Sequence, residues 1–265
     1  MATQEQEIYY QPELEVYCSD GREEELLQSI VNHPEIDQIK GNPARVLAAI
    51  DDYGRSKNFL MNVGRYKGPL VAEQIGKRKP KIMVELGGYV GYSAILFASR
   101  LRDVGGTKYI TLELNQAFAN VATRLIDLAG LGDFVEILVG PCRQSLRERL
   151  PKLLNNNQLD LIFFDHSKKD YANDLRLIEE IGLIKKGSTI IADNVITPGA
   201  PMYLEYVRSS VTEKLAAAAN FKAVEGQDLS RGNPYLVYEN THIKGLEPTG
   251  REDGIEISEC IGEES

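Results

Sequence analysis

The chain has 265 residues, of which 43% are hydrophobic and 26% charged, and these values are ordinary for a globular protein. A chain of this length can bury one substantial core, so we expect a single domain. The formal net charge of -9 argues against a nucleic-acid partner, because phosphate binding requires a concentrated basic surface. The composition therefore favours a small-molecule ligand.

The N-terminal stretch contains neither the apolar core of a signal peptide nor a run long enough to span a bilayer. We therefore expect a cytoplasmic protein without membrane contact, a monomer by default, in which residues 1–20 are loosely ordered. Cys18, Cys142 and Cys260 are too few and too scattered for a disulfide framework or a zinc ribbon. They are expected to be reduced thiols.

Helical patterns come first along the chain. Residues 22–33 and 42–58 are amphipathic, and Asn42 followed by Pro43 is typical of a helix N-terminus. From Lys81 onward, short β-branched runs alternate with amphipathic stretches, which predicts βαβ units and a parallel sheet. The expected strands are 81–86, 108–114, 134–140, 159–165 and 188–194, and the expected helices between them are 92–101, 116–130, 144–154 and 171–184.

Two more strand-like runs, 233–240 and 253–260, follow near the C-terminus with a Gly/Pro-containing loop between them. We expect them to form an antiparallel pair at the edge of the sheet. The earlier strands are almost continuously apolar, which is typical of a sheet that is covered on both faces. The sequence therefore predicts an α/β fold with a mostly parallel sheet and helices on both sides.

A glycine-rich turn, VELGGYVGYSA, follows the first expected strand and opens a helix, where α/β proteins bind nucleotide-like cofactors. The next strand ends in Glu113, about twenty residues later, a spacing that suits an acidic residue on ribose hydroxyls. Gly87, Gly88 and Gly91 do not fit the G-x-G-x-x-G register of a dehydrogenase. Glu85 at the strand end favours a cationic ligand over a pyrophosphate. S-adenosylmethionine meets these requirements; the alternative is a tight turn whose glycines serve packing alone.

Oxygen-bearing side chains follow two other expected strands. Asp165 ends the fourth strand, and Asp193 and Asn194 end the fifth. Neighbouring parallel strands lie about 5 Å apart, so these side chains should converge at the carboxyl edge, where open α/β sheets bind ligands. Two carboxylates and an amide predict a magnesium site. The alternative is ordinary turn chemistry, with Lys168 and Lys169 as solvated charges.

Six stretches of the sequence resemble catechol O-methyltransferases, in that family's order and at close to its spacings. They are FLMNVGRYKG (59–68), VELGGYVGYSA (84–94), ITLELN (110–115), FFDHSKKDY (163–171), IADNVITPGAP (191–201) and DGIEI (253–257). The resemblance extends over about residues 22–260 and combines several specific motifs. It implies a Rossmann-like methyltransferase sheet of seven strands in a single domain, residues 21–265, with N-terminal helices at about 22–78 covering the cofactor site.

The resemblance also implies roles for individual side chains. Asp165, Asp193 and Asn194 correspond to the magnesium ligands of the family. Lys168 corresponds to the general base, and Glu247 to the residue that binds the second catechol hydroxyl. Both are therefore expected to be catalytic.

Further positions correspond to the family's cofactor and substrate contacts. Those around S-adenosylmethionine, with Glu113 on the ribose, are Met61, Asn62, Val63, Glu85, Gly87, Tyr89, Ser93, Glu113, Leu114, Cys142, Arg143, Asp165, His166 and Ser167. Those around the substrate, including an apolar wall for its ring, are Phe59, Met61, Lys168, Asn194, Pro198 and Glu247.

The sequence departs from the family pattern at the cofactor and substrate pocket. Ser167 stands where vertebrate members carry a tryptophan, and the chain contains no tryptophan. Cys142 and Arg143 stand where vertebrate members have a serine and a glutamine. These changes leave the metal positions intact but alter the pocket wall.

The resemblance implies a magnesium-dependent O-methyltransferase of small catechols. Lys168 would take the proton of one hydroxyl, and the oxygen would attack the sulfonium methyl group in line. One alternative is a different vicinal diol as substrate, because Ser167 leaves more room. Another is a catalytically idle module that only binds S-adenosylmethionine, although the complete set of metal positions, Lys168 and Glu113 argues against it.

Overall fold

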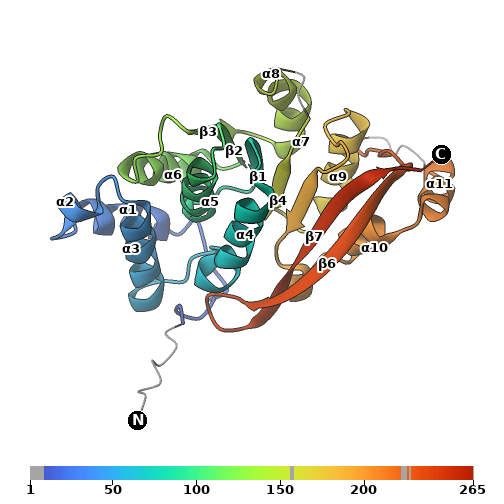
Figure 1. The fold of residues 1–265 in the computed structure, drawn as a ribbon. Coiled ribbons are helices and arrows are strands. Elements are labelled where there is room, and N and C mark those ends of the chain that lie inside the picture. The colour runs from blue at the N-terminus through green and yellow to red at the C-terminus, as the bar shows by residue number, and fades with distance from the viewer. Residues whose placement is uncertain (1–8, 156–157, 222–225, 227, 265) are drawn as a thin grey trace, which may run out of the picture.

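The computed structural model describes the chain except for residues 1–8, 156–157, 222–225, 227 and 265 (Figure 1). Within the described residues, seven strands form one sheet in the order β3-β2-β1-β4-β5-β7-β6. The strands are β1 (Ile82–Leu86), β2 (Lys108–Glu113), β3 (Val135–Val139), β4 (Leu161–Phe164), β5 (Thr189–Ala192), β6 (Leu236–Leu246) and β7 (Glu252–Glu263).

Strands β1 to β5 pair in parallel, whereas β7 is antiparallel to β5 and β6 is antiparallel to β7. Leu86 of β1 pairs with Phe164 of β4, which pairs with Ala192 of β5. The carboxyl ends of these three strands are therefore level, and the residues that follow them share one edge. The mostly parallel sheet and the antiparallel C-terminal pair are confirmed.

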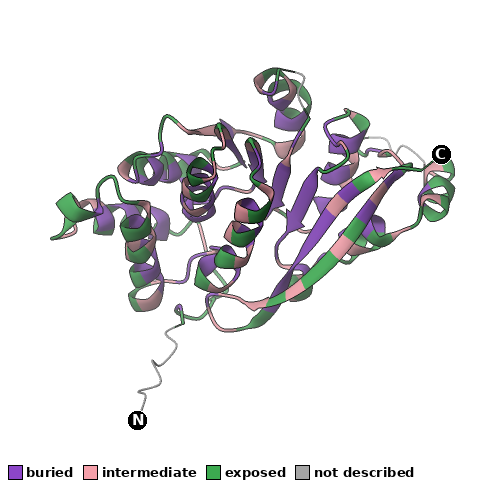
Figure 2. Ribbon diagram, in the orientation of Figure 1, coloured by how far each residue is buried: buried purple, intermediate pink, exposed green. Residues whose placement is uncertain are grey.

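Helices cover both faces of the sheet (Figures 1 and 2), and the strands between them are mostly buried. The first layer contains α1 (Arg22–Val31), α2 (Ile36–Ile39), α3 (Pro43–Ser56), α4 (Gly64–Arg78), α5 (Tyr92–Asp103) and α6 (Gln116–Leu128). The second contains α7 (Cys142–Gln144), α8 (Leu150–Leu153), α9 (Tyr171–Glu180) and α10 (Pro201–Arg208), with α11 (Val211–Ala219) beyond them. Near-continuous burial along β1, β2, β4 and β5 explains their near-continuous apolar sequence.

Several expected boundaries are wrong. The helix expected at 144–154 is interrupted by a π-helical turn, Ser145–Arg149, because Pro151 has no backbone N–H for a regular helix. The helix expected to reach residue 184 ends at Glu180, just before Gly182 with its positive φ of 73°. Strands β6 and β7 are longer than expected, since their outer ends are polar and paired with each other.

Part of the N-terminal segment packs against the fold, from residue 9 onward; residues 1–8 lie outside the described chain. Tyr10 is buried, its N–H donates to the Pro248 carbonyl at 2.8 Å, and its hydroxyl donates to Asp51 of α3. The buried ring of Tyr10 thus holds this stretch against the fold, although the surrounding sequence is polar.

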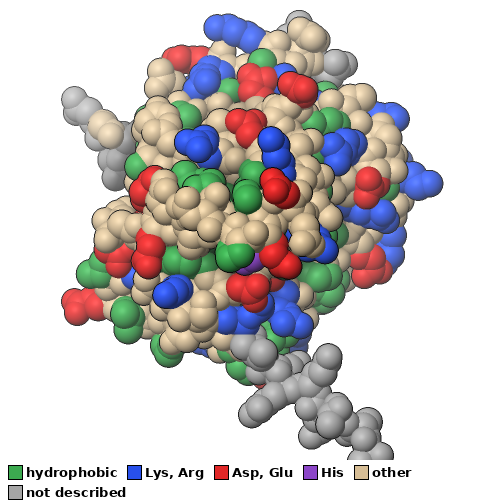
Figure 3. All heavy atoms as spheres, turned by 90° about the vertical axis from the view of Figure 1, so that its left-hand side faces the viewer, with side chains coloured by type: hydrophobic (Ala, Val, Ile, Leu, Met, Phe, Trp, Pro, Cys, Tyr) green, Lys and Arg blue, Asp and Glu red, His purple; other side chains and the backbone are tan. Residues whose placement is uncertain are grey.

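Charged side chains of both signs mix on the face shown in Figure 3, where basic groups lie among acidic ones. None of the described helices is both long enough and apolar enough to cross a bilayer.

Candidate active site

A cavity of about 1040 Å³ opens at the carboxyl edge of the sheet. Every predicted site residue except Glu85 lines it, although the residues come from segments far apart in the sequence. The predicted residues that line it are Phe59, Met61, Asn62, Val63, Gly87, Tyr89, Ser93, Glu113, Leu114, Cys142, Arg143, Asp165, His166, Ser167, Lys168, Asp193, Asn194, Pro198 and Glu247. The sheet topology thus brings the predicted cofactor, metal and substrate positions into one cavity.

The turn between β1 and α5 forms part of the cavity wall. Gly87 has φ 99°, and a Cβ atom there would lie 2.7 Å from the Asp165 carbonyl oxygen. Only glycine therefore lets this turn pass the backbone that follows β4. The glycine turn after β1 therefore lies directly beside the backbone of Asp165.

Glu113 connects this turn to the end of β2. Its carboxylate accepts the backbone N–H of Tyr89 at 2.7 Å and that of Asn115 at 2.7 Å. Burial raises the pKa of Glu113, and these backbone donors offset part of that effect. The side chain is held in one orientation, and each of its oxygens keeps a lone pair for a hydroxyl donor from a ligand.

Glu85 is the exception among the predicted residues. It is fully buried, lies outside the cavity lining, and makes no well-aligned hydrogen bond with a described residue. Burial raises its pKa from 4.5 to about 8, and the nearby hydroxyls of Ser93 and Thr111 offset only part of the effect. In this structure Glu85 is a buried acid behind the cavity wall rather than a direct ligand contact.

The pKa of Glu85 predicts how stability depends on pH. Between pH 4.5 and about 8 the folded protein holds a proton on Glu85 that the unfolded chain releases, so stability falls as the pH rises through this window. In Glu85→Gln the side chain does not titrate, so this loss of stability with rising pH is absent. The stability of the variant relative to the wild type should therefore increase by about 2–3 kcal/mol between pH 6 and 8.5. Urea unfolding at both pH values measures this difference, and parallel pH profiles of the two proteins would contradict it.

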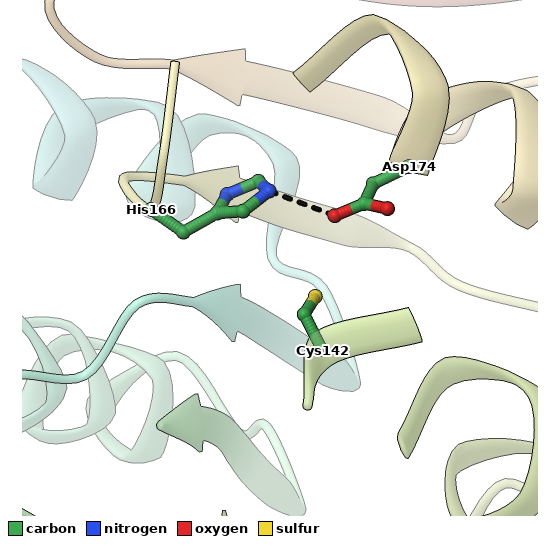
Figure 4. A group of neighbouring side chains, drawn as sticks. All are labelled: Cys142, His166 and Asp174. Carbon is green, nitrogen blue, oxygen red and sulfur yellow. Dashed lines mark hydrogen bonds and ion pairs between the residues drawn. The ribbon is translucent and has the colours of Figure 1, made fainter. Parts of the chain in front are cut away.

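Cys142, His166 and Asp174 converge at the cavity wall (Figure 4), and their ligand atoms lie within 4.8 Å of one another. The Nε2 atom of His166 lies 2.9 Å from Asp174 Oδ2, and its ring stacks on Tyr171 at 4.9 Å between centroids. Burial and the nearby Asp174 raise the pKa of the Cys142 thiol. These contacts fix the imidazole as a flat wall of the cavity.

The guanidinium group of Arg143 forms hydrogen bonds and ion pairs with other side chains of the protein. Its Nη1 atom donates to Asp174 of α9 at 3.0 Å, and its Nε atom lies 2.9 Å from an oxygen of Asp228. Arg143 also donates to the Ser230 hydroxyl at 2.9 Å. The residue lines the cavity, but its guanidinium joins α9 to the segment after α11.

Lys168 lies beside Asp165 in the turn after β4. Its Nζ atom donates to Asp165 Oδ1 at 2.8 Å and lies 5.3 Å from the centre of the Tyr171 ring. Both Lys168 and Asp165 are partly exposed to the cavity, whereas Lys169 is exposed and lies outside its lining. Of these two consecutive lysines, Lys168 therefore belongs to the cavity and Lys169 does not.

Asp193 and Asn194 follow β5 at the same edge. Asp193 is buried, and burial raises its pKa to about 6. Asn194 has a positive φ of 56°, and its amide nitrogen donates to Glu247 at 2.6 Å and to Asp253 at 3.0 Å. Because the nitrogen has these partners, the amide oxygen is the atom left for a ligand.

Glu247 lies in the loop between β6 and β7, where it reaches this edge of the sheet. Its Oε1 atom accepts hydrogen bonds from Asn194 and, at 2.6 Å, from Lys67 of α4. Phe59 and Pro198, the two ends of the expected apolar wall, line the same cavity, and Pro198 follows a cis peptide bond. The substrate positions thus adjoin the three predicted metal ligands.

Sequence reasoning missed Lys67 and Asp253. Lys67 is fully buried, and its Nζ atom contacts Asp193, Glu247 and Asp253. Both missed residues fall within stretches that resemble the family. However, a lysine in an amphipathic helix and an aspartate before a glycine are usually exposed to solvent, so neither position indicates a site. Only the tertiary structure shows that their charges meet.

The chain matches a family model described as O-methyltransferase over residues 52–218. It is 37% identical to a catechol O-methyltransferase of Bos taurus, with 77% of this chain and 72% of the relative covered. Identity to a catechol O-methyltransferase of Mus musculus is 39%, covering 77% and 74%. Catechol O-methyltransferase B of Danio rerio is 34% identical, covering 91% and 80%.

Solved structures share the fold. An O-methyltransferase from Bacillus cereus in complex with SAH superposes with a TM-score of 0.58 at 20% identity, covering 89% of this chain and 97% of that one. The O-methyltransferase TomG from Streptomyces achromogenes gives a TM-score of 0.56 at 20% identity, covering 93% and 92%. These matches support the architecture of the sheet and its helical layers.

Proposed function

Because the chain belongs to the catechol O-methyltransferase family, we propose that it transfers the methyl group of S-adenosylmethionine to one hydroxyl of a catechol with the help of Mg²⁺. Residues 21–265 would act as one methyltransferase domain. The observation that carries the proposal is the single cavity in which the predicted cofactor, metal and substrate residues meet.

Cofactor binding is supported by Glu113 and the glycine turn. The carboxylate is already oriented by two backbone N–H groups, so it can accept hydrogen bonds from both hydroxyls of a ribose without rearrangement. His166, held by Asp174 and stacked on Tyr171, offers a flat surface for an adenine ring. Ser93 and Asn62, two further positions expected around S-adenosylmethionine, line the same cavity.

The donor set at the strand ends fits Mg²⁺. Asp165, Asp193 and Asn194 offer two carboxylates and an amide oxygen, which are hard ligands, and all three line the cavity. The hydrogen bonds made by the Asn194 nitrogen leave its oxygen for such an ion. When bound, Mg²⁺ would act as a Lewis acid toward the two vicinal oxygens of the substrate.

The protein side chains would then handle the protons and the alignment. Lys168, next to Asp165, is placed to accept the proton of the hydroxyl that becomes methylated. Glu247 would accept a hydrogen bond from the other hydroxyl, and Phe59 and Pro198 would hold the ring. Alignment of oxygen and methyl group in a partly enclosed cavity supplies the remaining acceleration.

The exposed Ser167 at the cavity wall favours a second possibility for the substrate. A small side chain here leaves space beside the ring site. Vicinal diphenols larger than simple catechols would fit the same chemistry.

The test is methyl transfer from labelled S-adenosylmethionine to a panel of diphenols. We expect transfer to catechols but not to resorcinol, whose hydroxyls are too far apart to bind one cation together. Chelation should abolish the activity, and added Mg²⁺ should restore it. Transfer that is unaffected by the chelator would refute the metal requirement, and no transfer to any vicinal diphenol would refute the substrate class.

A further inference from the structure

Lys67 is a buried cation at the centre of three carboxylates. Its Nζ atom lies 2.7 Å from Asp193 Oδ1, 2.6 Å from Glu247 Oε1 and 2.5 Å from Asp253 Oδ2. The lysine side chain is 0% exposed. Because it comes from α4, while its partners follow β5 or belong to the β6–β7 hairpin, it joins three separate parts of the fold.

Asp253 extends this cluster to the substrate wall. Its Oδ1 atom accepts the backbone N–H groups of Ile196 and Thr197, at 3.2 and 2.9 Å, just before the cis peptide bond to Pro198. Its Oδ2 atom binds Lys67 and Asn194. The ammonium group of Lys67 is therefore connected to both Glu247 and the loop that carries Pro198.

The formal charges at this edge match one divalent cation. In the cluster around Lys67, three carboxylates and one ammonium group leave two negative formal charges; the groups are Asp193, Glu247, Asp253 and Lys67. Without the Lys67 charge, three negative charges would remain close together.

The three carboxylates around Lys67 have the spacing of a metal site themselves. Ligand oxygens of Asp193, Glu247 and Asp253 lie within 4.8 Å of one another. A carboxylate shared by two ions about 3.5–4 Å apart is the usual arrangement of two-metal centres, and Asp193 is placed to be such a bridge. The Lys67 ammonium group occupies the position where a second ion would bind.

We propose that Lys67 is a positioning residue that keeps this edge a one-metal site and holds Glu247 in place for the second substrate hydroxyl. The proposal rests on the proposed function, because it assumes one divalent cation at Asp165, Asp193 and Asn194. Lys67 does not touch the reacting atoms. It acts through Glu247 and by excluding a second ion from the acidic trio.

Lys67→Met tests this, with Mn²⁺ as the probe and its stoichiometry measured by electron paramagnetic resonance. Wild type should bind one Mn²⁺ per chain and the variant two. Turnover of the variant should fall about 30-fold or more with Mg²⁺, while its KM for S-adenosylmethionine stays within about twofold. If the methionine variant fails to fold, Lys67→Gln removes the same charge but keeps a hydrogen-bond donor, and two Mn²⁺ ions are again expected.

Two controls separate this effect from the loss of any buried lysine. Lys214→Met removes another buried lysine, which donates to the Leu236 carbonyl at 2.8 Å and lies over the rings of Tyr206 and Tyr238. It should bind one Mn²⁺ and retain wild-type turnover. The double variant Lys67→Met/Asp253→Asn reduces the trio to two carboxylates and should return to one Mn²⁺.

The outcomes distinguish the inference from the function on which it rests. One Mn²⁺ in both the wild type and the Lys67 variants would overturn the inference and leave the magnesium proposal standing. No Mn²⁺ in the wild type would overturn both. One ion in the wild type and two in the Lys67 variants, with single-ion binding in both controls, supports the inference.

Discussion

Lys168→Met should lower turnover by about 10²–10⁴-fold and leave the dissociation constant of S-adenosylmethionine within about twofold of the wild-type value. The reason is the position of the Lys168 amine, which lines the cavity and lies beside Asp165. In the proposed reaction this amine takes the proton of the substrate hydroxyl. Single-turnover methyl transfer and equilibrium dialysis of the labelled cofactor measure the two quantities separately.

The acidity of the substrate gives this prediction a second readout. A nitro-substituted catechol ionises without help, so the ratio of wild-type to variant rates should be much smaller with it than with catechol. Lys169→Met is the matched control, because Lys169 is adjacent in sequence but exposed and outside the cavity lining. An equal loss with both substrates would mean that Lys168 positions the substrate instead of accepting its proton.

The arrangement of the sheet could be predicted because each local pattern agrees with the fold. Apolar runs such as 161–164 favour a strand buried on both faces, and alternation with amphipathic helices favours parallel pairing. Structural details that depend on single residues could not be predicted from these patterns. Pro151 breaks the expected helix into a π-helical turn and α8, and the buried Tyr10 attaches part of a polar N-terminal segment to α3.

The site could be predicted where it follows directly from strand ends. Asp165 and Asp193 directly follow β4 and β5, and Glu113 ends β2, so parallel pairing alone places them at one edge. Lys67 and Asp253 could not be found this way. Their importance depends on how α4 and the β6–β7 hairpin pack against that edge, and a charged residue in a helix or turn gives no sign that it is buried.

Glu85 shows that the position of a residue along a strand does not by itself predict where its side chain lies. Its place near the end of β1 predicts a carboxylate that faces a cationic ligand, yet the side chain is fully buried and lies outside the cavity lining. A difference of one residue along a strand exchanges the two faces of the sheet, so sequence position near a site does not fix orientation.

Asp193→Asn is expected to lower turnover by about 10³-fold or more and to weaken Mn²⁺ binding strongly. Asp193 is the only carboxylate shared by the proposed metal position and Lys67, and it is 1% exposed. The amide keeps the size of the side chain but provides no negative charge, so a divalent cation would meet the Lys67 ammonium group with one compensating charge fewer. Turnover should be measured as a function of Mg²⁺ concentration, since partial recovery at high Mg²⁺ would locate the defect in ion binding.

The matched control for this variant is Asp160→Asn. Asp160 precedes β4 at the opposite edge of the sheet, where it pairs with Lys185 and accepts the backbone N–H of Lys81. That variant loses a charge of the same sign and two comparable contacts, so it should lose some stability but no Mn²⁺ affinity. Turnover of Asp193→Asn within tenfold of wild type at ordinary Mg²⁺ would remove Asp193 from the proposed ligand set.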